Sequence, residues 1–311
     1  MKKIVYYIVF TIWWSMSLLP LWVLYRISDV LYYLIYYIIR YRRRLVRKNL
    51  TISFPEKTQK EIIQTEKAFY SWFCDYIVET IKLMSMSKDE MKRRMRFEGV
   101  ELLEEQAAKG KSCGVYLGHY CNWEWVSSLP LSMSPDIILG QLYHPLENKH
   151  FDNLFIFIRE RMGAECIAME KALRRLVELR QQKKTAVIGF IADQKPHWAN
   201  IHYWTNLLNH PKTPMLTGTE KLIRGCNYSA FYIDMHRERR GYYVAKIKLL
   251  SETPKELADY ELTEMYVKAL EQSIRRDPAT WLWTHDRWKR TWERYCELYD
   301  PETRKRRPEA K

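Results

Sequence analysis

Residues 118–125, GHYCNWEW, contain a histidine and a glutamate whose types could support acid–base chemistry. The apolar run 113–117 precedes them and predicts a buried strand, so His119 would lie where α/β sheets gather ligands. Within one helix, positions i and i+5 do not share a face. If His119 lies in the turn before a helix, however, its ring can approach Glu124. The carboxylate would then take the proton of one ring nitrogen and leave the other nitrogen as a base. A hydrogen-bonded turn histidine is the alternative, because this spacing also occurs by chance.

A second polar pair, Asp193 and Gln194, also follows a predicted strand, at residues 185–193. Because the carboxyl ends of parallel strands meet at one edge of a sheet, this pair can face the same crevice as His119. The alternative is a turn former and helix cap before Pro196.

Two arginines, Arg159 and Arg161, end an amphipathic helical pattern in the segment FIRERMG. A planar guanidinium can hold a phosphate or a carbonyl oxygen, which makes both arginines candidates for substrate binding. Cations are also favoured at the end of a helix by its dipole, so a purely structural role stays open.

The remaining motifs do not suggest a nucleophile or a metal. The tryptophans of residues 281–292 recur at helical spacing with His285 among them, which predicts a packed aromatic face. No GxSxG or Gly-rich phosphate loop occurs, and Cys121 beside His119 is a weak signal. None of the six cysteines forms a CxxC pair or has zinc spacing with histidine, so we expect reduced thiols, no metal and no cofactor.

The N-terminus predicts a membrane anchor. Residues 4–25 contain no charged side chain, and a helix of about 20 apolar residues spans a bilayer. A cleaved signal peptide is the alternative, but no small-residue cleavage site follows. Pro20 lies inside the run and could kink it. The next apolar stretch, 27–39, is short for a span, so we expect it to lie at the interface or pack on the protein.

A basic cluster follows this apolar region. Positive residues beside a span stay on the cytoplasmic side and attract anionic headgroups. The alternative is a solvated helix face. The formal net charge of +14 also calls for an anionic partner, but the sequence shows no nucleic-acid-binding motif. The cluster that we expect to contact lipid consists of Arg40, Arg42, Arg43, Arg44, Arg47 and Lys48.

Predicted strands and helices alternate through most of the chain, which is typical of parallel βαβ units. We therefore predict an α/β fold with a mixed, largely parallel sheet flanked by helices and an N-terminal transmembrane helix. Residues 1–48 would form the anchor and basic juxtamembrane segment, 49–295 one catalytic domain, and 296–311 a basic, disordered tail. The strands are expected near 95–98, 112–118, 136–143, 165–169 and 185–193, with an antiparallel pair in 228–250 that turns near 239–241.

Several segments in order resemble the bacterial lipid A biosynthesis acyltransferases, the late lauroyl and myristoyl transferase family. Besides the apolar N-terminus, the resemblance rests on five segments and covers about residues 1–295. They are RKNLTISFPEKTQKE at 47–61, GHYCNWEW at 118–125, RERMGAECI at 159–167, ADQKP at 192–196 and WLWTHDRWKR at 281–290.

The resemblance implies a glycerol-phosphate-acyltransferase-like fold and an O-acyltransferase in the bacterial inner membrane, with its catalytic domain on the cytoplasmic side. Acyl carrier protein would deliver the acyl thioester, and a hydroxyl of a lipid A-type glycolipid would accept the chain. His119 would be the general base and Glu124 would orient it. Arg161 and Asp193 match family motifs and would belong to the site, together with Arg159 and Gln194.

Other functions stay open from the sequence. Residues 202–213 and the HDR at 285–287 depart from the family pattern. The same chemistry on an aminolipid, a glycerophospholipid or a mannosylated phosphoinositide is therefore an alternative. A non-catalytic basic tether for anionic lipid or nucleic acid is the alternative from another class.

Overall fold

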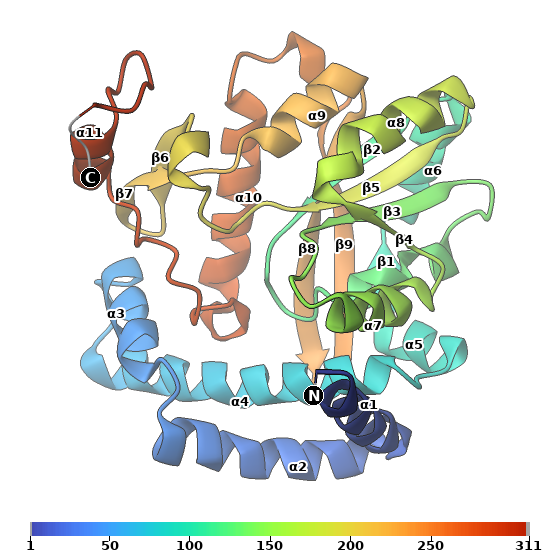
Figure 1. Cartoon of the computed structure of the whole chain (residues 1–311), viewed down its shortest axis with the longest axis vertical. Helices are drawn as coiled ribbons and strands as arrows, with labels where there is room; N and C mark the ends of the chain where they lie inside the picture. The colour runs from blue at the N-terminus through green and yellow to red at the C-terminus, as the bar shows by residue number, and fades with distance from the viewer. Residues whose placement is uncertain (1, 309–311) are drawn as a thin grey trace.

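The computed structural model describes residues 2–308, and a seven-stranded sheet forms its centre (Figure 1). The strand order is β1-β9-β8-β2-β5-β3-β4. Strands β8, β2, β5, β3 and β4 run parallel, β9 is antiparallel to β8, and β1 is parallel to β9. The mixed, largely parallel α/β fold is therefore confirmed. The bounds are β1 (Met95–Glu98), β2 (Cys113–Leu117), β3 (Ile138–Tyr143), β4 (Glu165–Ala168), β5 (Ala186–Ile191), β8 (Ser229–Arg239) and β9 (Tyr242–Ser251).

Helices and a small hairpin surround the sheet. The short antiparallel strands β6 (Trp204–Leu207) and β7 (His210–Pro214) form this separate hairpin within the segment that departs from the family pattern. The segment after the His119 loop is the 3-10 helix η2 (Trp125–Ser132), and Pro130 lies inside it. The other helices are α5 (Lys88–Arg94), α6 (Val100–Ala108), α7 (Lys149–Glu160), α8 (Ala172–Gln181), α9 (Gly218–Cys226), α10 (Glu261–Arg276) and α11 (Trp292–Leu298).

The N-terminal helices α1 (Lys2–Leu18) and α2 (Leu21–Tyr33) lie with α3 (Arg43–Ser53) and the long α4 (Gln59–Leu83) at one end of the molecule (Figure 1). The predicted continuous span 4–25 is wrong, because one helix ends before Pro20 and a second helix begins after it. Proline has no N–H to donate to the preceding turn and favours a helix start instead.

In the described part of the chain, one helix is long and apolar enough to cross a membrane, and it comprises Leu21–Ile39. It consists of α2 and the π-helical turn Leu34–Ile39 that continues it. This helix packs along α4 through polar contacts: Ser28 donates to Asp75 at 2.7 Å and Tyr36 donates to Glu66 at 2.9 Å. The stretch 27–39 thus packs on the protein on one side.

Many large apolar side chains of α1, α2 and the π-helical turn are exposed. Monomeric proteins seldom expose a large contiguous apolar patch unless it binds something, so this outer face is suited to lipid. Its exposed members are Tyr7, Ile8, Ile12, Trp14, Leu18, Trp22, Val30, Tyr33, Leu34, Tyr37, Ile38 and Ile39.

Two expectations about the C-terminal region differ from the structure. Residues 281–291 are a succession of turns and not a helix; hydrogen bonds to the loop after β2 hold them, and Trp281, Trp283 and Trp288 still pack together. The tail expected to be disordered continues α11 into a hydrogen-bonded turn, in which Asp300 N–H donates to Lys305 O. Residues 309–311 of that tail lie outside the described residues.

Candidate active site

The loop after β2 holds His119 firmly at the carboxyl end of the strand. The His119 carbonyl accepts a hydrogen bond from Leu282 N–H at 3.1 Å, and Cys121 N–H donates to Thr280 O at 2.8 Å. Gly118 favours this close packing, because a Cβ would lie 2.7 Å from Leu270 Cδ1 and 3.2 Å from an Asp193 carboxylate oxygen and would force Leu270 to shift. The fixed loop places the imidazole with little conformational freedom, as a positioned base requires.

The side chain that orients His119 is Asp193, which follows β5, the neighbour of β2. His119 Nδ1 lies 2.6 Å from Asp193 Oδ1, and the backbone N–H of His119 donates to Oδ2 at 2.8 Å. An ionised carboxylate only accepts hydrogen bonds, so Nδ1 carries the proton in this pair. In the neutral ring Nε2 then keeps its lone pair, which is the tautomer that a general base needs.

The Asp193 side chain is ionised although its carboxylate is almost fully buried. Burial alone would raise its pKa, but His119 and the indole N–H of Trp281, which donates to Oδ2 at 2.8 Å, lower the pKa to about 2. Arg287 is also buried and adds positive charge, while burial lowers its own pKa to about 10. The residue spacing in 281–292 suggested only aromatic packing, and no spacing rule links Trp281 to a residue 88 positions away.

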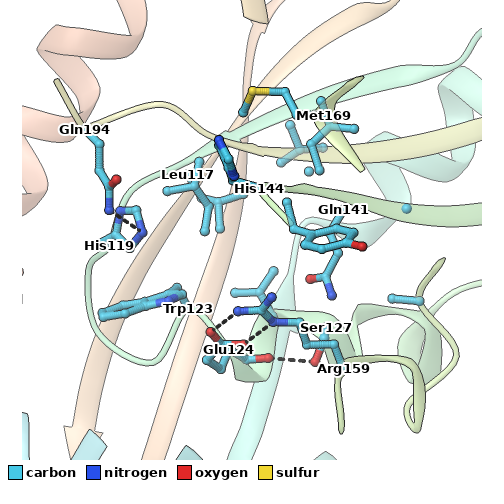
Figure 2. A pocket seen from close by; sticks show the side chains of 18 of the residues that line it. Leu117, His119, Trp123, Glu124, Ser127, Gln141, His144, Arg159, Met169 and Gln194 are labelled. Carbon is cyan, nitrogen blue, oxygen red and sulfur yellow. Dashed lines mark hydrogen bonds and ion pairs between the residues drawn. The ribbon is translucent and has the colours of Figure 1, made fainter. Parts of the chain in front are cut away.

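Glu124 has a different partner from the one expected. Its carboxylate accepts two hydrogen bonds from Arg159, with Nε at 2.7 Å and Nη2 at 2.6 Å (Figure 2). The expected contact in which Glu124 orients the His119 ring is thus replaced by the Asp193 contact. The reason is that β2 and β5 are neighbours, whereas Glu124 lies where the loop turns into η2 toward α7.

Gln194 lies on the other side of the imidazole. Its Nε2 is 3.2 Å from His119 Nε2, and Figure 2 shows this amide beside the ring. Since Nε2 is the unprotonated nitrogen, the amide N–H donates to it. The adjacent residues Asp193 and Gln194 thus contact the two different nitrogens of one imidazole ring.

A cavity of about 740 Å³ opens in front of Nε2, a size typical of small-ligand sites. His119, Gln194, Glu124 and Arg159 line it, and Trp123 packs edge-on against the imidazole with 5.0 Å between ring centroids. Apolar side chains from the sheet, η2 and α7 also line it, and the polar side chains of Ser127 and Gln141 face the same cavity (Figure 2). These apolar residues include Val115, Leu117, Leu129, Leu139, Phe155, Val187, Ile191 and Ile233.

Two sets of predicted residues lie apart from this cavity. Arg161 is not among the residues that line it; its Nη1 donates to Leu83 O at 2.6 Å and thereby caps the end of α4.

The basic cluster lies beyond the end of α2, where five of its six members surround a depression of about 590 Å³. These five are Arg40, Arg42, Arg43, Arg44 and Arg47.

A buried carboxyl group, Glu79 on α4, connects the catalytic loop to other elements. It accepts hydrogen bonds from Asn122 of the loop at 2.7 Å, from Tyr25 of α2 at 2.9 Å and from Tyr243 of β9 at 2.8 Å. Burial and the nearby Asp75 raise its pKa from 4.5 to about 7, although the three hydrogen bonds oppose the shift.

This raised pKa predicts a pH effect on stability. The folded state binds the Glu79 proton more tightly than the unfolded state, so stability falls as pH rises from about 4.5 to about 7. The shift corresponds to the order of 3 kcal/mol. Glu79→Gln should remove this slope, because its amide reproduces the protonated carboxyl: the oxygen accepts from Asn122 and Tyr243, and the NH₂ donates to Tyr25.

The check is the free energy of unfolding in denaturant across this pH range. Glu105→Gln, on the exposed side of α6, is the control and should keep the wild-type slope. A Glu79→Gln slope equal to that of the wild type would contradict the assignment.

The fold and site define a class: an α/β protein with a histidine–aspartate pair at the mouth of an apolar cavity and an apolar, basic N-terminal face. The family model described as bacterial lipid A biosynthesis acyltransferase matches residues 1–290, so the chain belongs to this family. No curated protein matches the sequence. Membership indicates acyltransferase activity of the lipid A type and association with a membrane.

Proposed function

We propose that this protein transfers a fatty acyl chain from an acyl-carrier-protein thioester to a hydroxyl of a lipid A-type glycolipid, with His119 as general base. The observation that carries the proposal is the His119 ring, fixed by Asp193 with Nε2 directed at an apolar cavity. The family match supports the acyltransferase class. We assign the site to the cytoplasmic side of the bacterial inner membrane.

In this reaction the acceptor hydroxyl displaces the Gln194 amide from Nε2 and gives its proton to that nitrogen. The oxygen then attacks the thioester carbonyl, and Asp193 stabilises the imidazolium that forms. The tetrahedral intermediate collapses with cleavage of the C–S bond, and the departing thiolate recovers the proton from Nε2. Gln194 N–H is then free to donate to the developing oxyanion.

A covalent acyl-enzyme on Cys121 has no support in the structure. The thiol is buried and donates a hydrogen bond to Thr280 Oγ1, and burial raises its pKa to about 12. A neutral, enclosed thiol is a poor nucleophile. Because a thioester is already activated, direct attack by the acceptor suffices.

The Glu124–Arg159 pair lies beside His119 in the same cavity, and we assign it to the positioning of the substrate. Arg159 uses Nε and Nη2 on Glu124, which leaves Nη1 for an acceptor oxygen. The carrier protein is an acidic partner, and Lys195 and His197 at the cavity wall, together with the basic net charge, favour its approach.

We propose that the outer apolar face of α1 and α2 enters the lipid interface and that the basic cluster, including Lys48, contacts anionic headgroups. Arg43 and Arg47 already pair with Glu66, and Arg42 donates to Thr284 O. The exposed Arg40, Arg44 and Lys48 are therefore the members most available to lipid.

Replacing Arg40 and Arg44 with serine should weaken binding to vesicles that contain anionic lipid, by about 1 kcal/mol or roughly fivefold for each charge. Vesicles of zwitterionic lipid should bind both proteins alike. Lys184→Ser, an exposed site between α8 and β5, is the control, since α8 lies at the far end from α2 (Figure 1). Equal binding of the double variant and the wild type to anionic vesicles would overturn this assignment.

The test of the proposed function is an assay of the purified protein with acyl-loaded carrier protein and a lipid A precursor in mixed micelles. Mass spectrometry should show a product heavier by one acyl chain, and His119→Ala should lose this product while keeping the wild-type melting temperature. Parallel reactions with an aminolipid, a glycerophospholipid and a mannosylated phosphoinositide identify the acceptor. Lipid A with an unchanged acyl count in a deletion strain would exclude lipid A as that acceptor. Binding to anionic lipid without any acyl transfer would favour a non-catalytic tether and overturn the proposal.

A further inference from the structure

The floor of the cavity is a regular lattice of side chains from three neighbouring strands. The register of β2, β5 and β3 places Val115, Gly189 and Gln141 in one row. The row nearer to His119 contains Leu117 and Ile191. In a strand, alternate residues point to the same face, so Val187, Gly189 and Ile191 of β5 all belong to the cavity face. All three line the cavity.

Gly189 is the one position of this β5 series without a side chain. Glycine in a strand interior lowers stability, and it often marks a place where a ligand comes close to the backbone. Its backbone does not require glycine, since its φ is not positive. A Cβ would meet Leu117 Cδ2 at 3.6 Å and Gly140 O at 3.7 Å, which are ordinary contact distances.

The neighbouring Gly140 has a different reason to be glycine. A Cβ there would lie 2.9 Å from both Ile167 Cδ1 and Ile188 Cδ1, so these two buried side chains would have to shift to make room for it. Neither packing nor backbone conformation explains Gly189. The missing side chain at this position therefore leaves space in the cavity itself.

The position of this space fits an extended alkyl chain. Val115, the partner of Gly189, precedes His119 by four residues, which corresponds to about 13 Å along the strand direction. Beyond Gly189 lies the row of Val187 and Leu139, whose side chains are 2% and 7% exposed. The cavity floor thus runs from the base through the Gly189 row to the buried, apolar residues Val187 and Leu139.

We propose that Gly189 sets the length of the acyl chain that the enzyme accepts, because the chain passes over this glycine before it reaches Val187 and Leu139. The proposal rests on the proposed function and adds the residue that selects among donors. A side chain at position 189 would shorten the cavity without touching His119 or Asp193. A change of one methylene in an apolar pocket alters selectivity by about 10-fold or more.

The experiment offers the purified protein an equal mixture of octanoyl, decanoyl, lauroyl, myristoyl and palmitoyl carrier proteins with the lipid acceptor, and mass spectrometry reports the transferred chains. Gly189→Leu should shift the product toward shorter chains. The kcat/KM of the longest donor used by the wild type should fall about 10-fold or more relative to the shortest. Gly189→Ala, whose added methyl fits the existing contacts, should give a smaller shift in the same direction.

Gly225→Leu is the matched control, because Gly225 is exposed on α9 and a Cβ there meets no atom within 4 Å. It should keep the wild-type distribution. A wild-type distribution of transferred chain lengths in both Gly189 variants would overturn the proposal. An equal loss of kcat/KM for every donor in Gly189→Ala, with an unchanged melting temperature, would also overturn it. Failure of the wild type to transfer any chain is a separate result, which would overturn the proposed function itself.

Discussion

Replacing Asp193 with asparagine is expected to lower kcat by about 10⁴-fold, the loss typical when a histidine base is held in the wrong tautomer. Oδ2 of Asp193 accepts two N–H groups, from the His119 backbone and from Trp281, so the amide oxygen of the substituted side chain must occupy that place. The NH₂ group then faces Nδ1, which is 2.6 Å from Oδ1 in the wild type. Nδ1 must accept this hydrogen bond, and the ring proton moves to Nε2, where it blocks the base.

The measurement is kcat and KM together with ¹⁵N NMR of the imidazole, which reports which nitrogen carries the proton. KM should change little, because Asp193 lies behind His119 and does not line the cavity. Asp234→Asn is the matched control, since Asp234 is also a buried aspartate, paired with Arg276 and Lys248 away from the cavity. It should lower stability and leave the tautomer unchanged. A normal kcat in Asp193→Asn, with activity lost in Glu124→Gln, would return the orienting role to Glu124.

The second large effect concerns stability. Arg159→Met is expected to lower the free energy of unfolding by about 3–5 kcal/mol, because it leaves the buried Glu124 charge without a partner. The Glu124 side chain is 6% exposed and that of Arg159 21%, and Glu124 receives both hydrogen bonds from this one guanidinium. The melting temperature should fall by about 10 °C in a protein of this size.

A matched control is available on α8, where Arg174 pairs with Glu178 at 2.9 Å but its side chain is 84% exposed. Arg174→Met should change stability by about 0.5 kcal/mol or less, as for other exposed pairs one helical turn apart. Combining Arg159→Met with Glu124→Gln should recover part of the loss, since the buried charge is then removed. Equal effects of the Arg159 and Arg174 substitutions would show that the Glu124 pair is effectively solvated.

The sequence predicted the strands of the main sheet, and the signal was clearest for β2 because its burial is uniform. All of 113–117 is buried, so a short apolar run was a sufficient signal for β2. The partner of His119 was harder to predict, because Asp193 is 74 positions away and becomes adjacent only through the sheet order. The prediction favoured Glu124, which is near in sequence. The available signal was that Asp193, like His119, directly follows a predicted strand.

Other differences have equally local causes. Pro20 was visible in the sequence, but hydropathy alone does not show whether a proline kinks a helix or ends it. The helical spacing of the tryptophans in 281–292 was real, yet hydrogen bonds to the loop after β2 hold the segment in turns. Such long-range backbone contacts leave no periodic pattern.

The backbone hydrogen bonds between residues 118–121 and 280–282 also have a consequence during protein synthesis. These two segments are about 160 positions apart in the sequence. Strand β1 likewise cannot pair until β9 has been synthesised, so the native sheet is rich in contacts between residues that are distant in the sequence. Such topologies fold slowly. During translation, at roughly 5–20 residues per second, α1 and α2 leave the ribosome long before residue 282. The helices α1 and α2, which are suited to lipid, are thus available to the membrane while residues 280–282, which hold the His119 loop, have not yet been made. The nascent chain would therefore reach its membrane before it can catalyse.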